Sequence, residues 1–315
     1  MKKILILGGG GYKGTVLVKY LLEQKYEIRV IDNFWFGNYL PSSKNLEIKQ
    51  KDIRDIDKTD FIDVDKIIHL ANIANDPSVE LDQNLSWEIN VLATKKIIEL
   101  SIDNNLEQMI FASSGSVYGV KSEEKVTEDL GLVPVSTYNK TKMIAERVLM
   151  SYSDKIKIHC IRPATVCGYS ERMRLDVSVN ILTYQALKNR KVTIFGGSQI
   201  RPNINIHDMK RVYKFFIKNN ENISSGFYNA GFENKSILDI ANLVRENIDC
   251  EFEIQESIDI RSYRLSSDKL LSLGFEQKYY VKDAVEEIKD YFNNGFLNNI
   301  DNMSNISWLK KQKYK

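Results

Sequence analysis

Short apolar runs alternate with longer amphipathic stretches along the first half of the chain. Six short runs rich in isoleucine, leucine, valine or phenylalanine predict strands at 2–7, 27–31, 46–50, 66–71, 108–112 and 156–161. Apolar residues recur at helical spacing over 82–102 and 136–150, and we expect helices there. Strands separated by helices predict an α/β fold with a doubly wound parallel sheet.

The pattern changes after Pro163, where a loop rich in charged and small residues begins. Beyond this loop, periodicity predicts a strand at 192–195 and helices near 177–188, 237–246 and 282–292. Two further elements, a helix near 208–218 and a strand at 226–230, are expected to return to the main sheet.

These elements divide the chain into two parts. The expected first domain covers residues 1–165 with returns near 205–230, and a smaller C-terminal α+β lobe covers 166–204 and 231–315. Because ligands of open parallel sheets bind beyond the carboxyl ends of the strands, a cleft is expected there, between the two parts.

The first strand runs directly into a glycine-rich turn that opens a helix. Gly8, Gly11 and Gly14 follow the spacing GxxGxxG. A turn without Cβ atoms can bend tightly and hold a pyrophosphate against the helix N-terminus. A merely flexible turn is the alternative, and the strand before and the helix after the glycines make it less favoured.

Asp32 ends the second predicted strand, 18 residues after Gly14. A carboxylate at this place can accept from both ribose hydroxyls of an adenosine and would repel a 2′-phosphate. The pattern therefore favours NAD over NADP as cofactor. The alternative for Asp32 is an ordinary aspartate of a strand-end turn.

Composition narrows the class of protein. The chain is 43% hydrophobic and 27% charged, as in an ordinary soluble globular protein, and its net charge of +2 argues against a nucleic-acid footprint. The basic tail 310–315 is more typical of a solvated terminus than of a binding site. Cys160, Cys167 and Cys250 have no metal-ligand spacing and fit a reducing compartment. No apolar run reaches the ~18 residues of a membrane span, so we expect a cytoplasmic protein without a bound metal.

Two further motifs carry the chemistry. Tyr138 and Lys142 lie four residues apart on a predicted helix and so share one face. The fifth strand ends in the run Ser113–Gly119, which reads Ser-Ser-Gly-Ser-Val-Tyr-Gly, and the fourth ends in His69-Leu70-Ala71. With the glycine turn, Asp32-Asn33, Asp52-Ile53 and Asn90, these motifs make the chain resemble an extended short-chain dehydrogenase/reductase. Within that group it is most similar to the nucleotide-sugar epimerase/dehydratase family, of the UDP-glucose 4-epimerase type with a Rossmann sheet.

The resemblance implies that Ser114, Tyr138 and Lys142 are catalytic. A tyrosine with a pKa near 10 is a poor base, but a nearby ammonium and an oxidised nicotinamide both favour its phenolate form. Tyr138 would take the proton from a sugar hydroxyl while its carbon gives a hydride to NAD. Ser114 would hold the same oxygen, and Lys142 would also hold the nicotinamide ribose. The alternatives are a helix-surface tyrosine and a turn serine.

The resemblance also implies two sets of binding residues. Those expected to contact NAD are Gly8, Gly11, Tyr12, Lys13, Gly14, Asp32, Asn33, Asp52, Ile53, Leu70, Ala71, Asn90, Ser113, Tyr138, Lys142 and Pro163. Those expected to contact a nucleotide-diphosphosugar are Asn75, Ser114, Asn180, Arg201, Arg261 and Tyr263. Arginine can bind phosphate oxygens bidentately, although a surface ion pair is the alternative for both arginines.

The loop before the second lobe contains Arg172-Met173-Arg174 and Asp176, as in a subgroup of the family. Phosphate or sugar recognition and a solvated charged loop are equally possible roles for it. Other positions depart from the family pattern: Asn203 and Asn205 replace an aromatic residue and a histidine, and Cys167 replaces a tyrosine. These departures concern the shape of the sugar pocket.

The net reaction is expected to be 4-epimerisation of a nucleotide sugar. Dehydratases of the family carry acidic residues directly after the catalytic serine or threonine, where this chain has Gly115 and Ser116. A dehydratase is therefore less favoured than an epimerase, while a C4 dehydrogenase or reductase remains a close alternative. An inactive NAD-binding regulatory module is less favoured because Tyr138 and Lys142 are both present. The helices expected at 82–102 and 136–150 resemble the pair that forms a four-helix dimer interface, which implies a homodimer.

Overall fold

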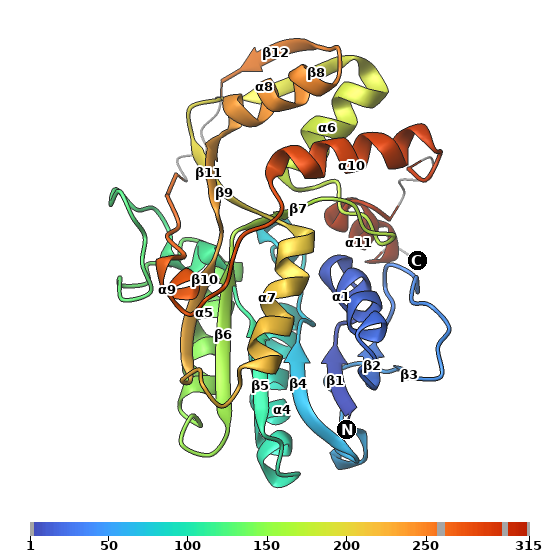
Figure 1. Cartoon of the computed structure of the whole chain (residues 1–315), viewed down its shortest axis with the longest axis vertical. Coiled ribbons are helices and arrows are strands. Elements are labelled where there is room, and N and C mark those ends of the chain that lie inside the picture. The colour runs from blue at the N-terminus through green and yellow to red at the C-terminus, as the bar shows by residue number, and fades with distance from the viewer. Residues whose placement is uncertain (1–2, 257–261, 298–301, 314–315) are drawn as a thin grey trace.

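The computed structural model describes residues 3–256, 262–297 and 302–313, and its centre is a seven-stranded parallel sheet (Figure 1). The strand order is β10-β6-β5-β4-β1-β2-β3. The strands are β1 (Lys3–Leu7), β2 (Ile28–Asp32), β3 (Leu46–Gln50), β4 (Val64–His69), β5 (Gln108–Ala112), β6 (Lys157–Pro163) and β10 (Gly226–Ala230). The order reverses between β1 and β4, which is where a doubly wound sheet opens a crevice.

Helices cover both faces of this sheet. In Figure 1, α1 (Tyr12–Glu23) and α7 (Ile206–Lys218) lie on the near face, while α4 (Ala93–Asp103) and α5 (Thr137–Met150) lie behind it. The alternation of side chains along β1 explains the pattern, because Ile4 and Ile6 join the core of the first face and Leu5 and Leu7 that of the second. Burial on both faces is the reason that the strand reads as a continuous apolar run.

Smaller elements connect these layers. They are the short helices α2 (Asp76–Val79) and α3 (Gln83–Trp87), the 3₁₀ turns η1 (Lys58–Phe61) and η3 (Gly115–Tyr118), and the π-helical segment η2 (Glu88–Leu92). The helix expected over 82–102 is therefore interrupted: α3 is followed by a π-helical turn before α4 begins.

The second lobe has its own apolar core. Its helices are α6 (Ser178–Asn189), α8 (Ile237–Asn247) and α10 (Val281–Asn293), packed beside the parallel pair β8 (Lys191–Phe195) and β12 (Glu251–Gln255). A three-stranded sheet, in the order β11-β9-β7, joins the lobe to the main sheet. Its strands are β7 (Thr165–Cys167), β9 (Ile200–Asn205) and β11 (Glu233–Ser236). Two further helices complete the chain, α9 (Asp268–Ser272) and α11 (Asn305–Lys313).

The fold class predicted from the sequence is confirmed. The six expected strands are six of the seven in the sheet, and the segment 226–230 returns to it as β10 beside β6. The expected fourth strand was placed slightly late, because the N–H groups of Leu70 and Ala71 already turn back to the carbonyl of Leu7. The three-stranded sheet was not predicted, since β9 and β11 carry mostly polar residues and show no alternating apolar pattern.

The start of α1 depends on the absence of a side chain at Gly14. A Cβ there would lie 2.5 Å from the carbonyl oxygen of Gly8 and 2.7 Å from the Cα of Gly9, and both are backbone atoms that cannot move aside. Helix α1 therefore crosses the end of β1 at a distance that only glycine permits.

We expect Gly14→Ala to destabilise the protein by about 1–3 kcal/mol, although alanine normally stabilises a helix by about 1 kcal/mol over glycine. The free energy of unfolding from urea titration measures this. Gly131→Ala is the control, because a Cβ at Gly131 meets nothing within 4 Å. Equal or greater stability of Gly14→Ala would show that the helix is not held against the turn.

Candidate functional site

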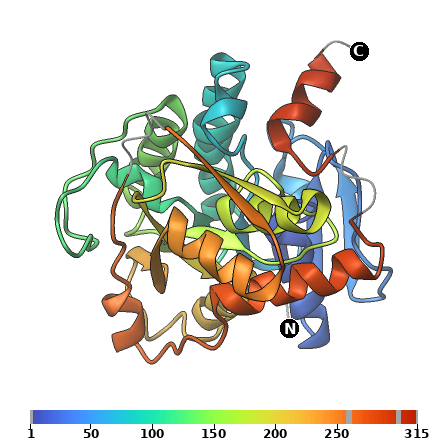
Figure 2. The same ribbon diagram turned by 90° about the horizontal axis from the view of Figure 1, so that it is seen from above.

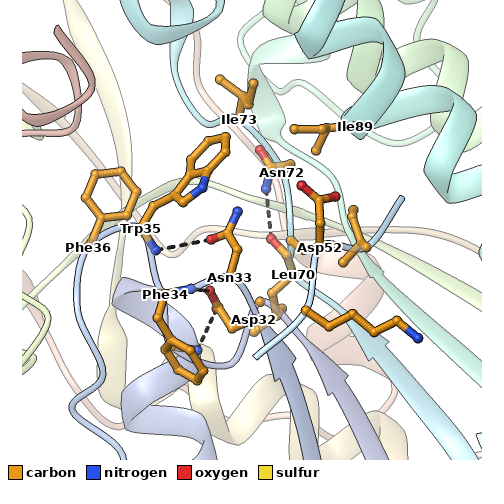
Figure 3. A pocket seen from close by; sticks show the side chains of 16 residues that line it. Asp32, Asn33, Phe34, Trp35, Phe36, Asp52, Leu70, Asn72, Ile73 and Ile89 are labelled. Carbon is orange, nitrogen blue, oxygen red and sulfur yellow. Dashed lines mark hydrogen bonds between the residues drawn. The ribbon is translucent and has the colours of Figure 1, made fainter. Parts of the chain in front are cut away.

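The carboxylate of Asp32 lies at the end of β2, beside the glycine turn (Figure 3). Its Oδ2 accepts from the backbone N–H of Gly10 at 2.8 Å, and its Oδ1 accepts from the N–H of Phe34 at 2.7 Å. Burial raises the pKa of Asp32, and these N–H donors oppose that rise. Each oxygen keeps a second lone pair, so the carboxylate is held in place with capacity to accept from a diol.

Asp32 is part of a pocket lined largely by apolar and aromatic side chains, which we call the aromatic pocket. Its lining residues are Gly8, Gly10, Gly11, Asp32, Asn33, Phe34, Trp35, Phe36, Lys51, Asp52, Ile53, Leu70, Ala71, Asn72, Ile73 and Ile89. Gly8 has a φ of +80°, and a Cβ there would lie 2.5 Å from the backbone nitrogen of Ala71. A flat ring system can enter such a pocket next to the diol acceptor.

A second cavity of about 450 Å³ continues from this pocket toward the second lobe, and we call it the wide cleft. Five residues line both cavities, namely Gly8, Gly11, Phe36, Leu70 and Asn72. The wide cleft is also lined by Tyr12, Lys13, Gly14, Ala74, Asn75, Asp76, Ser113, Ser114, Ser116, Tyr138, Pro163, Ala164, Thr165, Val166, Arg172, Arg174, Asp176, Val177, Ser178, Arg201, Tyr263 and Asn305. The glycine turn thus forms the passage between an apolar pocket and a polar one.

Tyr138 and Ser114 reach the wide cleft from two different elements. Ser136 caps α5 by accepting from the N–H of Asn139, which places Tyr138 in the first turn at the sheet edge. Burial raises the pKa of Tyr138 to about 12; Asp76 adds to the rise, while Arg174 and a hydrogen bond with Ser114 oppose it. Without a ligand, the phenol is therefore protonated at neutral pH.

The hydroxyl of Ser114 begins a short hydrogen-bonded chain. Its Oγ lies 2.7 Å from Oγ of Ser116, which donates to Oδ1 of Asn139 at 2.5 Å. Because the carbonyl of Asn139 can only accept, the proton of Ser116 is committed to it. Ser116 can then accept from Ser114, whose Oγ also accepts from the backbone N–H of Ser116 at 3.2 Å and keeps one lone pair for the phenol of Tyr138.

Lys142 does not line the wide cleft. Its Nζ donates to the carbonyl of Ala112 at 2.7 Å and lies 4.7 Å above the ring centre of Phe111. Burial holds the pKa of Lys142 well below its usual range; the charge of Lys13 adds to this effect and that of Glu146 opposes it. The amino group is thus held at the end of β5, next to the strand end that carries Ser114.

Helix α5 is joined to the sheet by a buried ion pair. Nη2 and Nε of Arg162, on β6, donate to the two carboxylate oxygens of Glu146 at 2.7 and 2.9 Å. Nη1 of Arg162 donates to Tyr118, which in turn donates to Asn229 on β10. This network links η3, which follows Ser114, with β6, β10 and α5, the helix that carries Tyr138.

Several cations line the wide cleft. Burial lowers the pKa of Lys13 to about 8, and Arg174 contributes to the shift. Nε of Arg174 donates to Asp176 at 2.7 Å, and the amide of Asn75 donates to the other oxygen of Asp176 at 2.7 Å. Nζ of Lys13 has no acceptor among the described residues. A cleft of this charge is suited to an anionic ligand.

Most residues predicted from the sequence line one of the two cavities, but three do not. Asn90 lies in η2, where its side chain accepts from the N–H of Ile73 and donates to Thr141. The buried amide of Asn180 contacts Tyr12, Gly168 and the carbonyl of Arg174, so it supports the cleft from behind. Lys142, described above, is the third.

Arg201 and Tyr263, both predicted substrate contacts, line the wide cleft. Arg261 lies outside the described residues. Sequence reasoning left the role of Arg172 and Arg174 open and did not single out Asn305 at all. No local signal could have found Asn305, because it lies far along the chain in a polar segment without a motif.

Two other features are absent from the described part of the chain. No group of three or more His, Cys, Asp or Glu side chains there is arranged to hold a metal ion. None of the described helices is long and apolar enough to cross a membrane.

The chain is similar to known proteins over most of its length. The model of the NAD dependent epimerase/dehydratase family matches residues 4–231. A UDP-glucose 4-epimerase of Halalkalibacterium halodurans is 27% identical over 313 residues, covering 90% of this chain and 93% of that protein.

Solved structures agree with this assignment. A UDP-glucuronic acid 4-epimerase of Bacillus cereus, solved with UDP-glucuronic acid and NAD, is 27% identical with a TM-score of 0.83, covering 93% of this chain and 99% of that one. A UDP-glucose 4-epimerase of Thermotoga maritima, 24% identical with a TM-score of 0.84 and covering 93% and 99% of the two chains, shares the fold. Because the family model covers the glycine turn, Asp32, Ser114 and Tyr138 together, the chain belongs to the NAD-dependent epimerase/dehydratase family.

Proposed function

We propose that this protein is an NAD-dependent 4-epimerase of a nucleoside-diphosphate hexose or hexuronate. The observation that carries the proposal is the meeting of Ser114 and Tyr138 in the wide cleft, next to the glycine turn and with no acidic residue at positions 115 and 116. The named activities of the relatives, UDP-glucose and UDP-glucuronic acid 4-epimerases, support the same reaction.

The residues present fit NAD. The aromatic pocket offers a slot for adenine with Asp32 at its mouth, and the N-terminus of α1 faces the passage into the wide cleft. At Gly8 and Gly14 an added Cβ would meet backbone atoms at 2.5 Å. The glycines therefore allow the tight turn in which a diphosphate can approach the backbone closely. NAD, when bound, supplies the hydride acceptor and donor for carbon 4 of the sugar.

Tyr138 is the proposed base for the hydroxyl on carbon 4, and Ser114 holds the same oxygen. The pKa of Tyr138, about 12 in the free chain because burial raises it, has to fall for this role. A positively charged nicotinamide beside the phenol would lower the pKa, as the charge of Arg174 already does in the free chain. After the keto sugar has rotated in the cleft to present its other face, Tyr138 returns the proton to the oxygen.

The nucleoside diphosphate is proposed to lie on the side of the second lobe. Arg201 on β9, Tyr263 and Asn75 all line the wide cleft. Arginine is suited to a diphosphate because its planar fork can donate to two oxygens at once.

Asp76 is a carboxylate in the wide cleft and could serve a different reaction, dehydration. It accepts a hydrogen bond from Ser136 at the start of α5, and its charge raises the pKa of Tyr138. A 4,6-dehydratase would need an acid and a base for carbons 5 and 6, and Asp76 is a residue that could supply one of them. The reaction in D₂O distinguishes the two possibilities.

The test is to incubate the protein in D₂O with UDP-, GDP-, CDP- and dTDP-hexoses and with UDP-glucuronic acid, and to identify the products by NMR. The hydrogen on carbon 4 is removed and returned without exchange during epimerisation, so we expect a C4 epimer without deuterium on carbon. Deuterium at carbon 6 of a keto-deoxy sugar would contradict the proposal, and a stoichiometric 4-keto product would indicate a dehydrogenase instead.

Tyr138→Phe tests the assigned base. The variant keeps the ring and loses only the hydroxyl, so we expect the turnover number to fall by about three orders of magnitude or more while NAD remains bound. Quenched-flow or endpoint assays of the C4 epimer, with cofactor content measured by absorbance, follow both properties. Turnover close to that of the wild type would place the base elsewhere.

Lys13 makes NAD binding depend on pH. Because burial and Arg174 lower its pKa to about 8, its ammonium loses the proton as pH rises from 7 to 9 in the free chain. Loss of this charge beside the glycine turn should weaken NAD binding by about tenfold over this range. Calorimetric Kd values in Lys13→Arg should remain nearly constant, and those of Lys13→Met should be weak throughout. The same slope in wild type and Lys13→Met would exclude the role.

We further propose a homodimer through the pair α4 and α5. Leu92, the last residue of η2 directly before α4, is an apolar side chain that is 61% exposed and is available to pack against the same helices of a second copy. Sedimentation should give a dimer for the wild type and a monomer for Leu92→Glu. Leu238→Glu, at an exposed leucine of α8 in the second lobe, is the control and should remain dimeric. A monomeric wild type would contradict the proposal.

A further inference from the structure

Arg172 is an almost fully buried cation whose hydrogen-bonding groups are only partly used. Its side chain is 4% exposed, yet it lines the wide cleft. Nη1 donates to the carbonyl of Met173 at 3.1 Å and Nη2 donates to Asn305 at 2.5 Å. Nε is buried and has no acceptor in the described part of the chain. A buried guanidinium with unsatisfied donors is costly, and the cost is removed when an anion binds.

The position of Arg172 identifies the part of the cleft that it faces. Its guanidinium is stacked on the ring of Phe36, 3.9 Å from the ring centre, and Phe36 lines both the aromatic pocket and the wide cleft. The charges of Arg172 and Asp32 also influence each other's pKa. Arg172 therefore lies beside Phe36 at the junction of the two cavities, which Gly8 and Gly11 also line.

Residues 302–308, which we call the C-terminal strap, hold Arg172 in this position. The carbonyl of Met303 accepts from the N–H of Leu175, and the backbone N–H of Asn305 donates to Asp176. On the other side, Asn302 donates to the carbonyl of Phe36 at 2.7 Å and Trp308 donates to that of Trp35 at 2.5 Å. Seen from above, α11 lies beside the first strands and away from α8 (Figure 2). The strap thus ties the arginine loop to the loop that follows β2.

A ligand that runs from the aromatic pocket into the wide cleft must pass this junction. The N-terminus of α1 faces the passage from one side with backbone N–H groups, which suit a diphosphate. Arg172 faces it from the other side with a planar set of donors, which suits the same group. Arg201 reaches the same cleft from β9, whereas Arg172 lies in the loop after β7, so the two arginines enter the cleft from different elements.

We propose that Arg172 binds the diphosphate of the dinucleotide cofactor from the side opposite the glycine turn, and that Asn305 of the C-terminal strap is its positioning residue. The second part of the chain thereby contributes directly to cofactor binding. This assignment requires a dinucleotide at the glycine turn and does not depend on which sugar is converted or on 4-epimerisation.

Calorimetry with cofactor-free protein tests the proposal with four probes: NAD, ADP-ribose, adenosine and UDP. Arg172→Met keeps an apolar stem over Phe36 and removes every donor. We expect its Kd for NAD and for ADP-ribose to rise about 10- to 100-fold, with adenosine and UDP unchanged within about twofold. Asn305→Ala keeps the charge of Arg172 but removes the hydrogen bond that holds it. The Kd values for NAD and ADP-ribose should therefore rise by a smaller factor. Arg245→Met, which also removes a guanidinium stacked on an aromatic ring but lies on α8 outside both cavities, is the matched control and should bind ADP-ribose normally.

Three results would overturn the proposal. The first is an unchanged Kd for NAD in Arg172→Met, which would make the arginine structural. The second is weaker binding of UDP with normal binding of NAD, which would assign Arg172 to the nucleotide sugar. The third is an equal loss for adenosine, which would mean that the aromatic pocket has collapsed. If Arg172→Met does not fold, Arg172→Lys, which keeps a point charge without the fork, is measured instead, and a Kd for ADP-ribose equal to that of the wild type would contradict the proposal.

Discussion

The buried ion pair of Glu146 and Arg162 fixes helix α5, which carries Tyr138, to the sheet, and the geometry of the site depends on it. Both side chains are fully or almost fully buried, and the guanidinium donates to both carboxylate oxygens. Such a pair is a weak source of net stability, since desolvation offsets most of the attraction, but the loss of one partner costs about 3–5 kcal/mol. Here the pair fixes the position of α5, because α5 cannot move along β6 without leaving a buried charge unpaired. Tyr138 and Lys142 therefore keep their places relative to Ser114.

The positive charge of the wide cleft matches the anionic ligands that the protein is proposed to bind. Lys13, Arg172 and Arg174 converge on one cavity, and only Arg174 is neutralised by a direct ion pair with a described carboxylate, that of Asp176. Burial and mutual repulsion lower the pKa values of Lys13 and Arg172, which shows that the free chain holds these charges at a cost. Two diphosphates, one on the cofactor and one on the nucleotide sugar, would offset that cost. Ligand binding and stability are expected to be strongly coupled for this reason.

Features that depend on local sequence could be predicted well. The strands of the sheet are buried on both faces, so each one appears as a short apolar run whatever lies beside it. Gly8 and Gly14 are identifiable because the backbone itself excludes a Cβ, and Asp32 is identifiable because the end of β2 has a fixed place relative to that turn. The strands β9 and β11 escaped prediction, since polar residues at a lobe junction carry no periodic signal.

The sequence by itself determined the sheet, the glycine turn and the pairing of Tyr138 with Lys142 on one helix, because those are set by periodicity and by backbone sterics over a few residues. Only the tertiary structure decided what each polar side chain faces. It turned Asn180 and Asn90 toward backbone partners behind the cavities, directed Lys142 to the carbonyl of Ala112, and brought Asn305 to Arg172 across 133 positions of the chain. Contacts between residues so far apart depend on how whole elements pack, and no local pattern encodes that packing.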